Sequence, residues 1–331
     1  MDTIFRLSSD GKTLEHVFDY IMGNHRIPEG VEVIPNRIFE GRKLLKNIII
    51  PHGVTTIGTR AFCGCSSLET ITLPDTIKTI GKEAFAGCDS LHTINLPNTI
   101  DTIEESTFEH CVSLKKLHIP NSVKTIGCRA FCQSGLEDVD IPDSVEIIDE
   151  EAFAGCWWLK SIDIPCSVTF LGAKAFQGCR ELQKIIIPNS ITKIYTSLFF
   201  MCESLEYVYL PDNIDFFAQQ AFLGCSSLKS INIPIGITGI GESAFLGCMD
   251  LKSIDIPESV RYIGSTAFKR CTSLENIYFR HHCIEYDDLD IFDDAFSEVD
   301  FDRCVLHVPS GTRWAYRNHT LFSKFTNIEI E

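Results

Sequence analysis

The sequence predicts a mostly β solenoid in which short coils stack against one another. Two observations predict it. A proline recurs at intervals of 23 residues, with one interval of 22, and a phenylalanine always lies eleven residues after it. A unit this short buries its apolar face only against its neighbours, so the units must stack. Eleven units fill residues 28–279, and they begin at Pro28, Pro51, Pro74, Pro97, Pro120, Pro142, Pro165, Pro188, Pro211, Pro234 and Pro257.

The pattern inside one unit predicts its elements. Residues 67–74, SLETITLP, alternate apolar and polar types and predict a short strand that the proline ends. Residues 76–81, TIKTIG, predict a second extended piece, whose final glycine would permit a turn with positive φ. Residues 82–88, KEAFAGC, have room for about one helical or 3-10 turn. We therefore expect a parallel sheet on the concave face, with short extended segments and turns elsewhere.

The repeat also resembles a known family. The pattern L-x-x-I-x-I-P-x-S-V-x-x-I-G-x-x-A-F-x-G-C, seen over residues 28–279, resembles the leucine-rich repeat of BspA-like surface proteins. Residues 8–31 resemble the hairpin cap at the amino end of that family, and residues 295–328 resemble a carboxy-terminal cap common in Bacteroides-type bacteria. The resemblance implies one continuous leucine-rich repeat solenoid, a right-handed curved superhelix, with a cap at 1–27, repeats at 28–279, and a cap with an acidic loop at 280–331.

Charge and hydropathy narrow the possible partners. The formal net charge is −16, which argues against nucleic acid and anionic membranes because phosphate contacts need clustered Lys and Arg. No apolar run approaches the roughly 18 residues of a membrane span. The first residues, MDTIFRLSSDGKTLEHVF, lack the layout of a signal peptide. We expect a cytoplasmic protein if Met1 is the native start, and the resemblance implies a surface or secreted one if an export signal was removed.

Nine of the 15 cysteines share one position in the repeat and must stack into a column. A structural zinc site brings four ligands together around one ion, whereas a column places its sulfur atoms along a line. Parallel stacking also holds the Cβ atoms about 4.8 Å apart with the side chains pointing alike, which is poor geometry for a disulfide. We therefore expect a buried column of thiols, which behave as small hydrophobes. Its members are Cys65, Cys88, Cys111, Cys156, Cys179, Cys202, Cys225, Cys248 and Cys271.

The sequence contains no pattern typical of catalysis. It has no Gly-rich phosphate loop, no G-x-S-x-G elbow and no H-E-x-x-H spacing. The cluster of His281, His282 and Cys283 could ligate a metal, but neighbours on an extended chain face opposite ways. The acidic segment 285–302 could hold Ca²⁺, although its spacing is not that of an EF-hand and a solvated loop is the alternative. We expect no enzyme, cofactor or metal site.

Exposed strand residues should form one continuous binding face, as in other solenoids. Aromatic residues beside oriented polar groups are typical of recognition patches. In the later units, aromatic residues occur at the strand positions two and four residues before the proline. A locally repacked core is the alternative for this region. A second candidate is the pair of adjacent tryptophans, which occupies a turn where most units place a polar residue. The candidate binding residues are Ile186, Tyr207, Tyr209, Asp140, Asp163, Tyr278, Trp157 and Trp158.

Two functions remain open. The first is a non-enzymatic binding or adhesion scaffold that recognises a protein or glycan, host-derived under the resemblance, through its concave face. The alternative is a structural module that self-associates weakly through Trp157 and Trp158.

Overall fold

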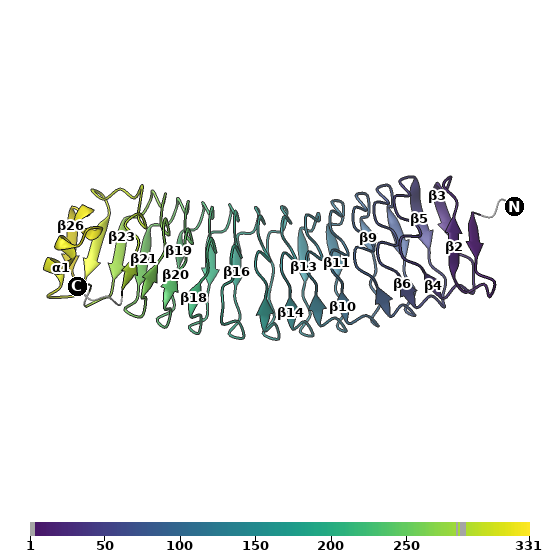
Figure 1. The fold of residues 1–331 in the computed structure, drawn as a ribbon, viewed down its shortest axis with the longest axis horizontal. Coiled ribbons are helices and arrows are strands. Elements are labelled where there is room, and N and C mark those ends of the chain that lie inside the picture. Colours follow the sequence, from purple (N-terminus) through teal and green to yellow (C-terminus); the bar gives the residue numbers. More distant parts are fainter. Residues whose placement is uncertain (1–3, 283, 285–288) are drawn as a thin grey trace. The chain divides into compact units, whose positions relative to one another are not determined.

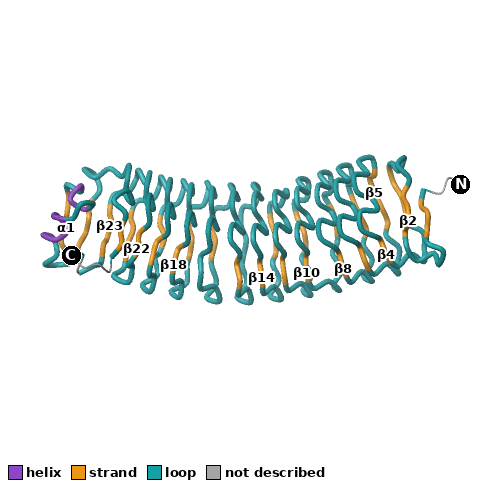
Figure 2. The backbone as a smooth tube through the Cα atoms, in the orientation of Figure 1, coloured by secondary structure: helices purple, strands orange, loops and turns teal. Residues whose placement is uncertain are grey.

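The computed structural model describes residues 4–282, 284 and 289–331. It divides into two compact units, Met1–Ala175 and Phe176–Glu331. Each unit is a stack of parallel coils, as predicted, and the strands within a unit run side by side (Figure 1). Loops and turns make up most of every coil, and strands the remainder (Figure 2). Among the described residues the only helices are α1 (Arg313–Asn318) and the 3-10 turn η1 (Phe322–Lys324).

Most coils contribute strands to two faces. We call the face built from the strands before the prolines the pre-proline face, and the face built from the strands after them the post-proline face. In the first unit the pre-proline face contains β3 (Gly23–Arg26), β5 (Leu45–Ile49), β7 (Thr70–Thr72), β9 (Thr93–Ile94), β11 (Lys116–His118) and β13 (Asp138–Asp140). Its post-proline face contains β4 (Val33–Ile34), β6 (Thr56–Ile57), β8 (Thr79–Ile80), β10 (Thr102–Ile103), β12 (Thr125–Ile126), β14 (Ile147–Ile148) and β15 (Phe170–Leu171).

The second unit repeats this arrangement. Its pre-proline face contains β16 (Lys184–Ile186), β17 (Tyr207–Tyr209), β19 (Ser230–Ile231), β21 (Ser253–Ile256), β23 (Asn276–Phe279), β25 (Val305–Val308) and β26 (Asn327–Ile330). Its post-proline face contains β18 (Phe216–Phe217), β20 (Gly239–Ile240), β22 (Tyr262–Ile263) and β24 (Asp290–Ile291). Every paired strand in this unit is parallel to its neighbour.

The core of each unit is a column of stacked phenylalanine rings. The centroids of neighbouring rings lie 4.7–5.9 Å apart, and the ring planes are nearly parallel. Stacked aromatic rings add stabilisation beyond the apolar area they bury. The phenylalanine at the eleventh position of each repeat is therefore the main packing residue of its coil.

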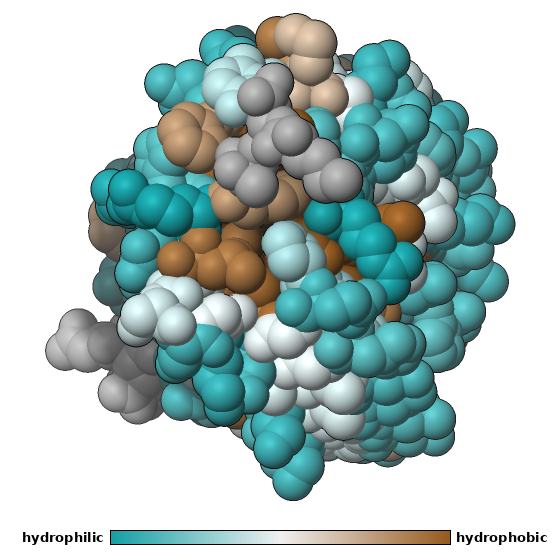
Figure 3. Space-filling view, turned by 90° about the vertical axis from the view of Figure 1, so that its right-hand side faces the viewer, coloured by the Kyte–Doolittle hydropathy of each residue, from teal (hydrophilic) through white to brown (hydrophobic). Residues whose placement is uncertain are grey.

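The first unit begins with an antiparallel hairpin of β1 (Phe5–Leu7) and β2 (Leu14–Val17). Phe5 packs edge-on against Phe39, at 6.2 Å between ring centroids, and so ends the phenylalanine column. Figure 3 looks onto this end of the unit, where apolar side chains gather near the middle of the surface and polar ones surround them. The residues from 23 onward already belong to the parallel ladder, because β3 pairs with β5.

The structure has roughly 13 turns, whereas the proline spacing predicted eleven repeats. One further coil lies in the segment expected to be only a cap. Phe296 stacks on Phe268 at 4.9 Å, and β25 continues the ladder of β23. The proline alignment missed this coil because Arg280 stands where the next proline would be, and because 28 residues instead of 23 separate the two phenylalanines.

The glycine that ends the second extended piece of the repeat, such as Gly81, was expected to permit a turn with positive φ, and this prediction is wrong. Gly81 has no positive φ, and a Cβ built on it would lie 2.5 Å from the backbone nitrogen of Thr59 in the preceding coil. Only a hydrogen fits there. The positive φ falls two residues later, at Glu83 (54°), and at the equivalent Arg60 (57°). These left-handed residues interrupt the segment that was expected to form a helical turn, so the described repeats have successive turns instead.

Candidate binding face

The predicted aromatic patch lies on the pre-proline face of the second unit. Its members belong to β16 and β17, which pair so that Ile186 lies opposite Tyr209 and Lys184 opposite Tyr207. All three apolar members are exposed: Ile186 by 57%, Tyr207 by 40% and Tyr209 by 56%. Alternate residues of a strand point to opposite faces, so the buried Val208 between the tyrosines anchors the strand while both rings point outward. We call Ile186, Tyr207 and Tyr209 the tyrosine patch.

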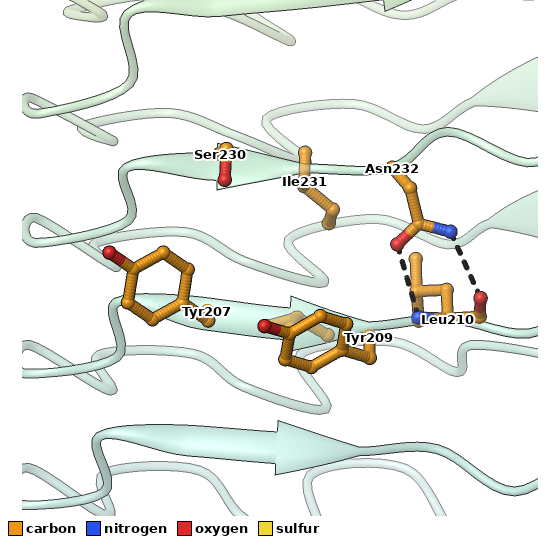
Figure 4. A pocket seen from close by; sticks show the side chains of 7 residues that line it. Tyr207, Tyr209, Leu210, Ser230, Ile231 and Asn232 are labelled. Atoms are coloured by element: carbon orange, nitrogen blue, oxygen red, sulfur yellow. Dashed lines mark hydrogen bonds between the residues drawn. The ribbon is translucent and has the colours of Figure 1, made fainter.

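Beside the tyrosine patch lies an open cavity of about 470 Å³. Small ligand sites usually range over about 300–1,000 Å³. The small side chain of Ser230, opposite Tyr207 on β19, leaves this space (Figure 4). The lining residues are Tyr207, Val208, Tyr209, Leu210, Ser230, Ile231 and Asn232.

Asn232 fixes one end of the cavity. Its Oδ1 accepts a hydrogen bond from the backbone nitrogen of Leu210 (3.2 Å), and its Nδ2 donates to the Leu210 carbonyl (2.9 Å), as Figure 4 shows. The ladder between β17 and β19 ends at Val208 and Ile231. The asparagine side chain therefore satisfies the backbone groups that the short strand leaves unpaired.

The ring of Tyr207, which lines the cavity, contacts a neutralised cation. Lys229 Nζ lies 5.6 Å from the centroid of the Tyr207 ring and 2.6 Å from the carboxylate of Glu206. Glu206 raises the pKa of Lys229 through this hydrogen bond, so the amine stays charged but paired. One side of the Tyr207 ring is thus occupied by the protein itself.

Tyr278 differs from the tyrosine patch although it occupies the equivalent position before the next coil. Its ring stacks on His307 at 4.4 Å, and the guanidinium of Arg280 lies 5.2 Å from its centroid. Arg280 is in turn paired with Asp255 at 2.7 Å. Because these contacts hold the ring against the carboxy-terminal coils, Tyr278 is half-buried and less available than Tyr209.

Asp140 and Asp163 belong to the first unit, whereas the tyrosine patch belongs to the second. Asp140 ends β13 and lies opposite His118. Both aspartates are exposed, and in the part of the chain that the structure describes neither forms an ion pair.

Trp157 and Trp158 also belong to the first unit and lie in the turn after the buried Cys156. Both are exposed, by 49% and 56%. The next residue, Leu159, is fully buried in the core. Two adjacent exposed tryptophans are unusual on a monomer surface.

All nine cysteines of the predicted column are buried thiols. The thiol donates a hydrogen bond of 3.0–3.4 Å to the carbonyl of the phenylalanine one coil earlier. This bond is formed by Cys65, Cys88, Cys111, Cys156, Cys202, Cys225, Cys248 and Cys271. Burial raises the pKa of these thiols, to about 12 for Cys202. In the shortened fifth unit the buried Ser134 takes the same place, with its Oγ 3.4 Å from Cys156 Sγ.

Within the described ranges no group of three His, Cys, Asp or Glu side chains is placed to hold a metal ion. Cys283, Glu285, Asp287 and Asp288, which belong to the two clusters noted in the sequence, lie outside those ranges. Two of the described acidic residues contact the protein: Asp294 accepts a hydrogen bond from Ser265, and Glu298 pairs with Arg270.

One exposed aromatic group was not expected from the sequence. On the post-proline face Phe216 stacks with Tyr262 at 6.4 Å, although they lie two coils apart. Gly239 lies between them, and a Cβ there would lie 2.5 Å from the Phe216 ring. The glycine thus lets the two rings meet. The sequence could have indicated this contact, because Gly239 occupies the repeat position equivalent to Phe216 and Tyr262, in the coil between them.

Comparison with known proteins agrees with this architecture. The family model described as the BspA type leucine rich repeat region matches in six copies, over residues 19–137, 124–245 and 200–307. The chain belongs to this BspA-type leucine-rich repeat family. No curated protein matches the sequence significantly. No described helix is long and apolar enough to cross a membrane.

Solved structures of bacterial repeat proteins resemble this BspA-type chain. A leucine rich cell surface protein from Faecalibacterium prausnitzii is 28% identical with a TM-score of 0.61, and the alignment covers 100% of this chain and 94% of that one. A leucine-rich repeat protein from Bacteroides ovatus is 26% identical with a TM-score of 0.51, covering 86% and 92%. The pneumococcal vaccine antigen PcpA, at 23% identity and a TM-score of 0.66 over 99% and 82%, shares the fold.

Proposed function

We propose that this chain is a non-enzymatic adhesion or interaction scaffold that binds its partner through the tyrosine patch of the second unit. The observation that carries the proposal is the direct pairing of exposed Ile186 with exposed Tyr209, beside a cavity that Tyr207 also lines. Tyrosine and exposed aliphatic side chains that lie together are typical of binding hot spots. The family supports an interaction or adhesion scaffold in general terms.

A pull-down tests this proposal. The double variant Tyr207→Ala/Tyr209→Ala should lose a partner that the unaltered chain captures from an epithelial cell extract. A matched control, Thr70→Ala/Thr72→Ala, removes side chains at the equivalent strand positions of β7 in the first unit. Equal capture by all three proteins would contradict the proposal.

A surface location forms part of the same proposal. The Faecalibacterium prausnitzii structure is described as a cell surface protein, and this chain covers nearly all of its length. Protease treatment of intact cells should remove the protein, while an intracellular marker remains. Protection of both would argue for a cytoplasmic location.

Self-association is a second candidate function, favoured by one observation. Trp157 and Trp158 are both about half exposed in one turn, where most other coils present small or polar residues. Sedimentation at increasing protein concentration should show a rise in mass that Trp157→Ser/Trp158→Ser abolishes. A constant monomer mass for the unaltered chain would remove this candidate.

A further inference from the structure

The cavity beside the tyrosine patch has an uncharged lining, although the chain carries a net charge of −16. Its polar groups are two phenol hydroxyls, the Ser230 hydroxyl and the Asn232 amide. These groups both donate and accept hydrogen bonds. They suit a ligand that carries hydroxyl groups rather than one that carries a carboxylate, sulfate or ammonium group.

The backbone around the cavity is already satisfied. β17 pairs on one side with β16 and on the other with β19, and Asn232 closes the remaining gap at Leu210. An extended peptide that binds by strand addition needs an unpaired sheet edge. Because none is present at β17, recognition here depends on side chains alone.

The ring of Tyr209 is the available aromatic surface. In the described part of the chain its hydroxyl has no hydrogen-bond partner and its ring has no aromatic or cationic neighbour, whereas the ring of Tyr207 is contacted by Lys229. The face of an aromatic ring is electron-rich and attracts positively polarised hydrogens. The C–H groups on the apolar face of a sugar ring have this polarity, and the surrounding hydroxyl and amide groups can bond its hydroxyls.

The charges around the cavity indicate which sugars fit. Lys229 is neutralised by Glu206, and the exposed Asp212 follows the lining residue Leu210 by two positions. An acidic sugar would find no free cation in this lining, because Lys184, which lies opposite Tyr207 on β16, is outside it.

We propose that this cavity binds a neutral pyranose unit of a glycan, stacked on Tyr209 and hydrogen-bonded by Tyr207, Ser230 and Asn232. This inference rests on the proposed function of the tyrosine patch and names the chemistry of its ligand. A protein partner recognised through its polypeptide is the competing outcome of the test.

Saturation-transfer NMR with methyl glycosides of glucose, galactose, mannose and N-acetylglucosamine tests the proposal directly. At least one glycoside should receive saturation from the unaltered protein, and Tyr209→Ala should weaken its binding at least tenfold. Tyr209→Phe keeps the ring and should bind within a few-fold of the unaltered chain. Thr72→Ala, on the pre-proline face of the first unit, is the control and should change nothing.

The outcomes separate this inference from the proposed function. No transfer to any of the four glycosides overturns the inference, and so does equal transfer to the Tyr209→Ala variant. Capture of a cell-extract partner that needs both tyrosines but survives periodate oxidation of the extract also overturns it, while leaving the proposed function intact. Tyrosine-independent capture would contradict the proposed function itself.

Discussion

Ile186 and Tyr209 lie directly opposite each other on neighbouring parallel strands, and more than half of each side chain is exposed. Both side chains point away from the core. The core residues of these two strands are the buried Ile185 and Val208. A cross-strand contact of this kind adds only about 0.2–1 kcal/mol of folding stability, and much of the apolar surface of both side chains remains exposed. This pairing is the reason to assign a binding role to the face.

The tyrosine patch should be removable without loss of stability. We expect Tyr207→Ala/Tyr209→Ala to change the free energy of unfolding by about 0.5 kcal/mol or less per site, because both side chains are exposed. Phe217→Ala, at a fully buried aromatic of the same unit, should cost about 3–5 kcal/mol. Urea unfolding measures both. A large loss in the tyrosine variant would show that these rings belong to a repacked core.

The thiol column should make the fold sensitive to alkali. Burial raises the pKa of Cys202 to about 12 from an ordinary value of 9.0, and burial also raises the pKa of Cys156 to about 12. The unfolded chain therefore loses these protons first as the pH rises above 9. The stability that the protonated thiols contribute is complete below pH 9 and falls by up to about 1.4 kcal/mol per pH unit for each thiol above it.

Urea unfolding at pH 8, 9 and 10 tests this prediction. The free energy of unfolding should fall between pH 9 and 10, and less steeply in Cys202→Ala once its lower starting stability is subtracted. In the native protein at pH 8 the column thiols should resist Ellman's reagent and react only after unfolding. Few reactive thiols in the denatured chain would mean that disulfides had formed.

The repeat glycine should tolerate no side chain. Gly81→Ala would place a Cβ 2.5 Å from the backbone of Thr59, and overpacking of this kind costs about 1–3 kcal/mol or more. Thermal unfolding of Gly81→Ala should show a clear fall in Tm, whereas Lys78→Ala at an exposed site of the same coil should not. Equal Tm values would show that the coils can move apart to make room.

Arg129 should stabilise the first unit by linking three coils. It forms ion pairs with Glu109 and with Glu151, the latter at 2.8 Å, and both carboxylates are largely covered. Burial alone would raise the pKa of Glu109, but the hydrogen bonds from Arg129 and Ser106 lower it overall. The stability from this carboxylate is present above its unfolded pKa of 4.5 and is lost as the pH falls through its lower folded value.

Replacing this arginine tests the linkage. Arg129→Met leaves Glu109 covered without its arginine partner, which should cost about 1–3 kcal/mol at pH 7. The cost should shrink at pH 3, where Glu109 is protonated in the variant. Lys116→Met, at an exposed pair with Asp138, is the control and should change stability by less than about 1 kcal/mol. An equal cost for Arg129→Met at both pH values would contradict the electrostatic explanation.

Much of the fold could be predicted because each coil depends on its own short pattern. The phenylalanine at the eleventh position and the apolar residues around it define one coil, and repetition of the pattern defines the stack. Where the pattern changes, the prediction failed. Phe296 continues the ring column without a preceding proline, so the spacing did not reveal its coil.

The candidate site was predicted less completely, since it depends on contacts between coils. Period-two alternation was enough to place Tyr207 and Tyr209 on the exposed face. The cavity, however, results from small Ser230 beside Tyr207 and from the hydrogen bonds of Asn232 to the neighbouring coil. At Tyr278 the same strand position is covered by His307, which lies on the next strand, and by Arg280, which stands where the repeat pattern has a proline.

Site-specific photo-crosslinking tests the central claim most directly. A benzophenone amino acid placed at Ile186, next to the intact tyrosines, should crosslink the partner in cell extract, and adding Tyr209→Ala should abolish the crosslink. The same probe at Thr72, on the equivalent strand position of the first unit, should give no adduct. Equal adducts from both positions, or an adduct at Ile186 that survives Tyr209→Ala, would contradict the assignment of binding to the tyrosine patch.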